Sequence, residues 1–127
     1  DVTGVQTCAL PIYIPVQIIG VDTVREPDGL ALSSRNVRLS SDERAQAPVI
    51  HRALSLAREA LLSGAGADTA RAVFASEIAA APSARVEYVS VAHPESLSEL
   101  TGQVDAAVVS CAVWFGDVRL IDNVLVP

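Results

Sequence analysis

The stretch AAVVSCAVWFGDVRLIDNVLV, residues 106–126, contains two runs rich in β-branched and aromatic residues. The runs cover 106–115 and 118–126, and Gly116 and Asp117 separate them as a two-residue loop typical of a β-hairpin. A third run of this kind lies at residues 86–91. The pattern predicts a small, three-stranded and antiparallel sheet.

Two helices are expected ahead of the sheet in the sequence. Ser40 and Glu43 have the S-x-x-E spacing of a capping box, which satisfies two free N–H groups at a helix start. Pro48 should kink this first helix, and Gly64 should end it. Its apolar face comprises Ile50, Leu54, Ala57 and Leu61.

Asp68 is expected to cap the second helix, and Pro82 to end it. Its apolar face comprises Ala70, Val73, Phe74, Ile78 and Ala81. A further short helix of one or two turns is expected over residues 94–100, because Pro94 suits a first helical turn. Helices followed by strands in this order predict an α+β domain with two main helices and a three-stranded antiparallel sheet.

The N-terminal residues suggest a chain cut from a longer protein. Residues 2–12 resemble a translated sequencing adapter, so residues 1–12 are treated as a non-native segment, Cys8 included. The run from Ile14 to Thr23 predicts one buried strand, of the kind found in parallel sheets covered by helices. No βαβ partner follows it, and we therefore expect an N-terminal domain to be absent.

Composition excludes several classes of function. The chain has 127 residues, a formal net charge of -6 and two cysteines, which argues against a nucleic-acid surface and a disulfide framework. No apolar run approaches the roughly 18 to 20 residues of a membrane span. No secretory signal is apparent, so a cytoplasmic location is expected. All nine basic residues are arginine, and a bound phosphate would be met by guanidinium, hydroxyl or backbone N–H groups.

Ser33, Ser34 and Arg35 form the most informative group for chemistry. Two adjacent hydroxyls and a guanidinium after a turn at residues 25–29 suit the oxygens of a polyphosphate. The alternatives are a polar loop before a capped helix and, for Arg35, a surface pair with Asp28 or Glu26. His51, His93, Cys111 and Trp114 lack partners at metal-ligand or catalytic spacing and are interpreted as structural.

The stretch TVREPDGLALSSRN, residues 23–36, closely resembles the signature loop of the pantothenate synthetase family, also called pantoate-beta-alanine ligases. The resemblance continues through residues 38–40, 86–89, 94–97 and 119–123, and covers nearly everything after Tyr13. It implies that residues 13–39 end a truncated Rossmann-like nucleotide-binding domain and carry its ATP-phosphate loop. Residues 40–127 would form the C-terminal lid domain.

The resemblance also implies an activity. Members of the family condense pantoate with beta-alanine through a pantoyl adenylate, using ATP and magnesium and releasing AMP and pyrophosphate. Val24 would hold adenine through its backbone, and Leu32, Ser33, Ser34 and Arg35 would line the phosphates, although the family usually has Met at the position of Leu32. No catalytic or metal-ligating residue is carried over, because the catalytic residues and magnesium ligands are expected in the absent N-terminal part.

The full-length protein is accordingly expected to be a homodimer whose partners are small-molecule substrates, and this chain alone to be inactive. Two other hypotheses remain open from the residues. The chain could be a non-catalytic α+β interaction domain, or part of a different adenylate-forming nucleotidylyl transferase with a similar loop.

Overall fold

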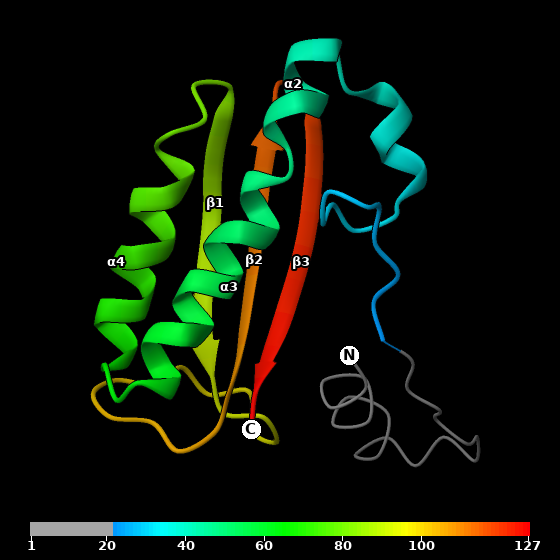
Figure 1. Cartoon of the computed structure of the whole chain (residues 1–127). Coiled ribbons are helices and arrows are strands. Elements are labelled where there is room, and N and C mark those ends of the chain that lie inside the picture. The colour runs from blue at the N-terminus through cyan, green and yellow to red at the C-terminus, as the bar shows by residue number, and fades with distance from the viewer. Residues whose placement is uncertain (1–21) are drawn as a thin grey trace, which may run out of the picture.

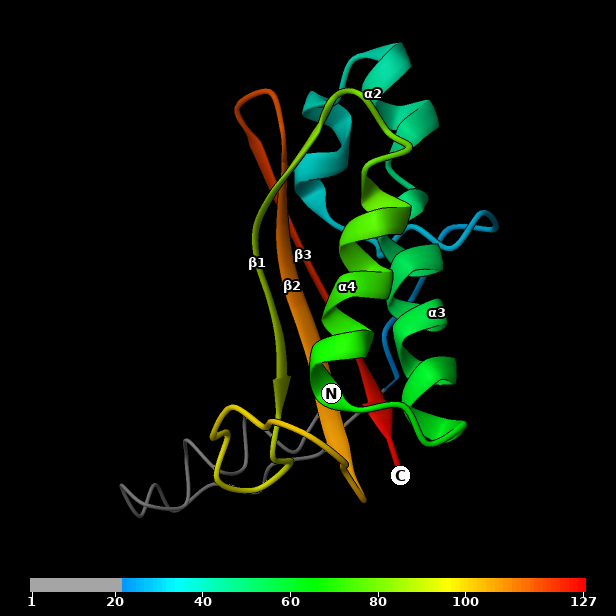
Figure 2. The same ribbon diagram turned by 90° about the vertical axis from the view of Figure 1, so that its left-hand side faces the viewer.

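Two helices pack on one face of a three-stranded sheet, and an N-terminal segment lies along the free edge of that sheet (Figures 1 and 2). The structure, a computed structural model, describes residues 22–127. The adapter-like segment and nearly all of the strand predicted over 14–23 lie outside the described residues. Among residues 22–127 no helix has the length and apolar character that crossing a bilayer demands.

The sheet confirms the predicted hairpin. Strands β1 (Ala84–Ala92), β2 (Ala107–Phe115) and β3 (Val118–Val126) lie in that order, and each pairs antiparallel with its neighbour. Gly116 makes the turn between β2 and β3 with a φ of 62°, which a glycine adopts without steric cost. A register shift between Val86 and Tyr88 leaves Glu87 as an extra residue in β1.

The first predicted helix forms as two, α2 (Ser41–Gln46) and α3 (Val49–Leu62), because Pro48 interrupts it. The capping box is present. The hydroxyl of Ser40 accepts from the backbone N–H of Glu43 at 3.2 Å, and the Glu43 carboxylate accepts from the Ser40 N–H at 2.9 Å. The predicted apolar face of α3 is buried.

The second helix, α4 (Ala67–Ile78), begins before the predicted cap. Its N-cap is Gly66, and the prediction for Asp68 was wrong, since this residue lies in the first turn of the helix. Its carboxylate instead accepts from Arg71, one turn further along, at 2.9 Å. The helix also ends before Pro82, because Ala79 is already its C-cap.

The short helix predicted over 94–100 is absent. The imidazole Nδ1 of His93 accepts from the backbone N–H groups of Glu95 and Ser96 at 3.1 and 3.2 Å, which folds the chain into a turn. Leu97 then has a φ of 60°, which a helix does not allow. The chain returns to β1, where the N–H of Leu100 donates to the carbonyl of Val91 at 2.9 Å.

The core lies between the helices and one face of the sheet. Its largest fully buried side chains include Phe74, Phe115, Ile50 and Leu54, and small alanines from both helices let the layers approach closely. The opposite face of the sheet is not covered by the helices (Figure 2). Tyr88, Ile121 and Leu125 of the strands are exposed.

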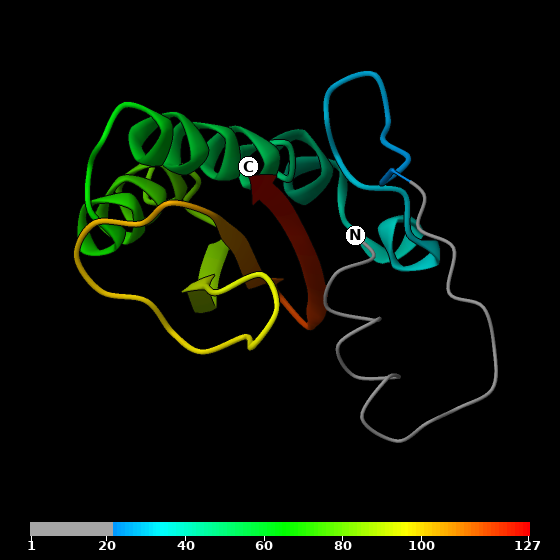
Figure 3. The same cartoon turned by 90° about the horizontal axis from the view of Figure 1, so that it is seen from below.

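The segment before α2 runs beside β3 (Figure 3). Residues 24–32 form a hairpin, named here the docking hairpin, in which the N–H of Leu32 donates to the carbonyl of Val24 at 2.9 Å. A 3-10 helix, η2 (Ser34–Arg38), follows where the sequence predicts a loop. The hydroxyl of Ser33 caps it by accepting from the N–H of Arg35 at 3.1 Å.

Candidate functional site

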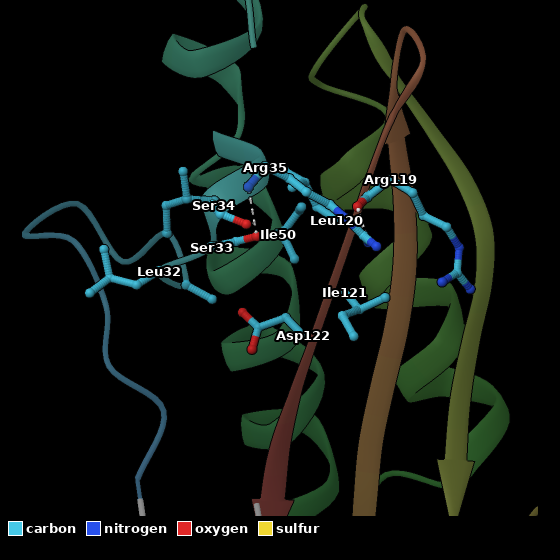
Figure 4. A pocket seen from close by; sticks show the side chains of 11 residues that line it. Leu32, Ser33, Ser34, Arg35, Ile50, Arg119, Leu120, Ile121 and Asp122 are labelled. Carbon is cyan, nitrogen blue, oxygen red and sulfur yellow. Dashed lines mark hydrogen bonds between the residues drawn. The ribbon is translucent and has the colours of Figure 1, made fainter. Parts of the chain in front are cut away.

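A cavity of about 440 Å³ lies between the end of the docking hairpin and strand β3 (Figure 4). The chain from residue 30 to 35 forms one wall, residues 119–122 of β3 form the other, and Ile50 of α3 closes the base. The lining residues are Leu30, Ala31, Leu32, Ser33, Ser34, Arg35, Ile50, Arg119, Leu120, Ile121 and Asp122.

The predicted phosphate-binding residues come together in this cavity. Leu32, Ser33, Ser34 and Arg35 all line it, and the hydroxyl groups of the two serines point toward β3 (Figure 4). Because the Ser33 oxygen accepts from the Arg35 N–H, its own hydroxyl proton remains available to a ligand. This wall of the cavity therefore presents hydroxyl donors next to a guanidinium.

Arg35 spans the gap to the opposite wall. Its Nη1 donates to the backbone carbonyl of Arg119 at 3.3 Å. Within residues 22–127 no carboxylate forms an ion pair with it, and the alternative pairing with Asp28 is wrong, because Arg44 holds that carboxylate at 2.7 Å. The charge of Arg35 is thus not neutralised by a neighbour, and most of its N–H donors remain for an anion.

Val24 lies outside the cavity lining. Its side chain is 63% exposed, and its carbonyl already accepts from the N–H of Leu32. The role predicted for its backbone toward adenine stays a prediction. The structure brings together the four predicted phosphate residues, and Val24 lies opposite Leu32 in the docking hairpin but outside the cavity lining.

The wall from β3 contributes residues that the sequence did not single out for the site. Asp122 is 8% exposed and is the only buried charged residue in the described part of the chain. Its carboxylate receives two hydrogen bonds from Arg25, from Nη1 at 2.6 Å and from Nη2 at 3.0 Å. A bidentate pair of this kind is both strong and directional.

Arg119 contributes its backbone carbonyl to the cavity, whereas its guanidinium pairs with a carboxylate on β1. Its Nε and Nη2 donate to the carboxylate of Glu87 on β1 at 2.8 and 3.0 Å, and the indole of Trp114 donates to the same carboxylate at 2.8 Å. The hydrogen bonds from Arg119, and to a smaller extent the one from Trp114, lower the pKa of Glu87 to about 2. Arg35 is therefore the cation of the cavity that has no anionic partner among the described residues.

Neither metal binding nor nucleophilic chemistry is supported by the described residues. Residues 22–127 contain no group of three or more potential metal ligands. Cys111 is buried in β2, where desolvation raises the pKa of its thiol to about 12. Burial and the nearby charge of Arg25 lower the pKa of His51, whose Nδ1 has no hydrogen-bond partner. Both side chains fit the structural role expected from the sequence.

A smaller cavity of about 250 Å³ adjoins the first on the uncovered side of the sheet. The two share Ala31, Leu32, Ile121 and Asp122 in their walls. The second adds hydroxyl and amide groups from Thr23, Tyr88, Ser110 and Asn123.

Comparison with known proteins gives one consistent result. The family model for pantoate-beta-alanine ligase matches residues 2–125. A pantothenate synthetase of Chloroflexus aurantiacus is 56% identical over 114 residues, which are 88% of this chain and 41% of that protein. The corresponding protein of Thermus thermophilus is 49% identical over 111 residues, or 86% of this chain and 40% of its own length.

Solved structures agree with the sequence comparison. The crystal structure of pantothenate synthetase from Thermus thermophilus matches with a TM-score of 0.86 at 41% identity, covering 97% of this chain and 45% of that one. The pantoate-beta-alanine ligase of Francisella tularensis, solved with beta-gamma ATP and beta-alanine, matches with a TM-score of 0.56 at 26% identity and covers 95% and 38%. The chain spans about 41% of the length of the first curated relatives that it matches.

Proposed function

Since the chain belongs to the pantoate-beta-alanine ligase family, we propose that it is part of an enzyme that joins pantoate to beta-alanine at the expense of ATP. The pantoate carboxylate attacks the α-phosphate of ATP, which gives pantoyl adenylate and pyrophosphate. The amine of beta-alanine then displaces AMP to form pantothenate. The longer protein that would contain this chain is called the complete enzyme below.

We assign to Ser33, Ser34 and Arg35 the binding of the ATP phosphates. The observation that carries this assignment is the guanidinium of Arg35, which lines the same cavity as the two serine hydroxyls and pairs with no carboxylate among the described residues. Charge that builds up on the departing pyrophosphate would be stabilised most by a cation fixed in place beforehand. The link from Arg35 to the Arg119 carbonyl would hold that cation in place before ATP arrives.

The test is exchange of labelled pyrophosphate into ATP, dependent on pantoate, in the complete enzyme. We expect Arg35→Ala to raise the KM for ATP by about 10- to 100-fold, the size typical of a lost hydrogen bond to a charged group, and to lower kcat as well, because the same cation faces the departing pyrophosphate. Arg58→Ala is a matched control. Arg58 also donates to a carbonyl of β3, that of Leu125 at 2.8 Å, but it does not line the cavity.

Equal KM values for ATP in the Arg35 and Arg58 variants would contradict the assignment. Exchange that depends on a different carboxylic acid, and not on pantoate, would instead favour another adenylate-forming transferase. An interaction domain without catalysis would show no exchange in the complete protein.

The remaining expectations form part of the same proposal. Residues 13–39 would end the nucleotide-binding domain, and residues 40–127 would form a lid over it. Magnesium would be held by the ATP phosphates and by residues outside 22–127, because Asp122, the one carboxylate lining the cavity, is engaged by Arg25. We further propose a homodimeric complete enzyme located in the cytoplasm, and no turnover by this chain alone.

A further inference from the structure

We propose that Arg25 and Asp122 are a pair of positioning residues that fix the phosphate-binding residues 32–35 to strand β3, so that the loop and the strand move as one body. The inference rests on the proposed function and adds to it two residues that are not assigned to any ligand. It is carried by the geometry of the ion pair and of the docking hairpin.

The ion pair joins segments that are far apart in the sequence. Arg25 and Asp122 are 97 residues apart, yet two hydrogen bonds of 2.6 and 3.0 Å connect them. The Arg25 side chain is 19% exposed and that of Asp122 is 4% exposed, so water screens the pair weakly. The Asp122 carboxylate also accepts from the N–H of Asn123 at 2.7 Å, which fixes its orientation on β3.

The same guanidinium also holds the shape of the docking hairpin. Nη1 of Arg25 donates to the carbonyl of Gly29 at 3.1 Å, across the turn. Backbone bonds from Glu26 to Leu30 at 2.7 Å and from Leu32 to Val24 at 2.9 Å complete the hairpin. Arg25 therefore connects three parts at once: the turn, its own strand of the hairpin and the last strand of the sheet.

Three other contacts place the tip of the hairpin on the helical layer. The carboxylate of Asp28 accepts from Arg44 of α2 at 2.7 Å. Leu30 is buried in the core, and Gly29 approaches the ring of His51 so closely that a Cβ would lie 2.7 Å from Cδ2. These contacts define where the tip sits. The ion pair is the contact that reaches β3, whose residues 119–122 form the opposite wall of the cavity.

The position of the phosphate residues follows directly. Leu32 ends the hairpin and Ser33 comes next in the chain, so a shift of the hairpin along β3 would move both serines relative to the Arg119 carbonyl. In Figure 4 the Asp122 carboxylate lies below Ser33 and Ser34, on the same side of β3. The pair thus supports the site from beneath while its charges cancel, which leaves Arg35 as the cation offered to phosphate.

A purely structural role would be a competing explanation, because removing one partner of a buried pair also destabilises the fold. The two roles differ in what they change. Positioning predicts a selective loss of ATP binding, whereas loss of stability lowers the amount of active enzyme and leaves each KM unchanged.

The experiment uses the complete enzyme with Asp122→Asn and Arg25→Lys. We expect Asp122→Asn to raise the KM for ATP about tenfold with the KM for beta-alanine unchanged. Arg25→Lys keeps the charge but loses the fork geometry, so its rise should be about threefold. Arg52→Gln is the control, since the Arg52–Glu77 pair of 2.5 Å is exposed and joins α3 to α4 away from the cavity.

A second readout needs no turnover. Trypsin cleaves after arginine, and release of the loop should speed cleavage after Arg35, measured by mass spectrometry, in Asp122→Asn but not in Arg52→Gln. A wild-type KM for ATP together with wild-type cleavage in Asp122→Asn would overturn the inference. Circular dichroism shows whether Asp122→Asn folds. If it does not, Arg25→Lys is the deciding variant, and an unchanged KM for ATP in Arg25→Lys overturns the inference.

The two proposals can fail separately. A wild-type complete enzyme without pantoate-dependent exchange refutes the proposed function, while faster cleavage after Arg35 in Asp122→Asn would still support the docking role of the pair. Loss of ATP binding in Arg35→Ala together with no effect in Asp122→Asn refutes only the positioning role.

Discussion

Replacement of Gly29 by alanine should lower the free energy of unfolding by about 2 to 4 kcal/mol. Gly29 has a φ of 97°, in the left-handed region, and this costs an alanine about 1 kcal/mol. A Cβ at this position would also lie 2.7 Å from Cδ2 and 3.2 Å from Cγ of His51. Forcing an atom into such a contact displaces the ring or the hairpin, at a typical cost of about 1 to 3 kcal/mol.

Gly64 provides a matched control within the same chain. It has the same φ of 97°, but a Cβ there would meet no atom within 4 Å. Gly64→Ala should therefore show the backbone cost alone, about 1 kcal/mol. Combining Gly29→Ala with His51→Ala removes the ring, and the added cost of the glycine substitution should then fall to the value found at Gly64.

Urea unfolding followed by tryptophan fluorescence measures these differences, because Trp114 is the single tryptophan of the chain. Equal losses of stability for Gly29→Ala and Gly64→Ala would refute the argument that the hairpin tip is seated against His51. In the complete enzyme, Gly29→Ala should also raise the KM for ATP, since it displaces the segment that leads into Ser33.

Two further perturbations test the structure away from this contact. Ser40→Ala removes the acceptor for the Glu43 N–H and should lower the free energy of unfolding by about 1 kcal/mol. Ser41→Ala, the neighbouring control, should change that free energy little. Equal effects of the two substitutions in urea unfolding would contradict the capping box. Glu87→Gln tests the sheet surface. Because the hydrogen bonds from Arg119 and Trp114 lower the pKa of Glu87 from 4.5 to about 2, its stabilising contribution is fully present above pH 4.5 and is lost as the pH falls toward 2. The stability gap between wild type and Glu87→Gln should close over that range, whereas a gap that does not depend on pH would show that the ion pair contributes nothing.

Local patterns were sufficient to predict most elements of the fold. The β-branched and aromatic runs of residues 106–126 and the Gly116-Asp117 pair were enough to predict the hairpin, because turn geometry and the pairing of adjacent strands are decided by near neighbours. The capping box of Ser40 and Glu43 was also predicted correctly, because its two residues are close in the sequence. The prediction for residues 94–100 failed because Pro94 suits a turn as well as a helix, and the deciding contacts come from the His93 ring.

Only one wall of the cavity, the one that contains residues 32–35, could be predicted from the sequence. Residues 32–35 are contiguous, and their hydroxyl and guanidinium groups indicate phosphate chemistry without knowledge of the fold. The other wall depends on contacts between distant residues. A signal for it does exist: Asp122 falls in the core-facing phase of β3, between apolar residues at alternate positions, and a carboxylate in such a position requires a partner. Nothing in the sequence identifies Arg25 as that partner.

The separation of Arg25 and Asp122 has a consequence for biosynthesis. The ribosome adds the aspartate 97 residues after the arginine, so the docking hairpin cannot form its ion pair with β3 until that strand has left the exit tunnel. Contacts of such long range slow folding, because the intervening chain must be ordered first. A premature stop codon upstream of position 122 would release a polypeptide whose docking hairpin lacks its ion pair with β3.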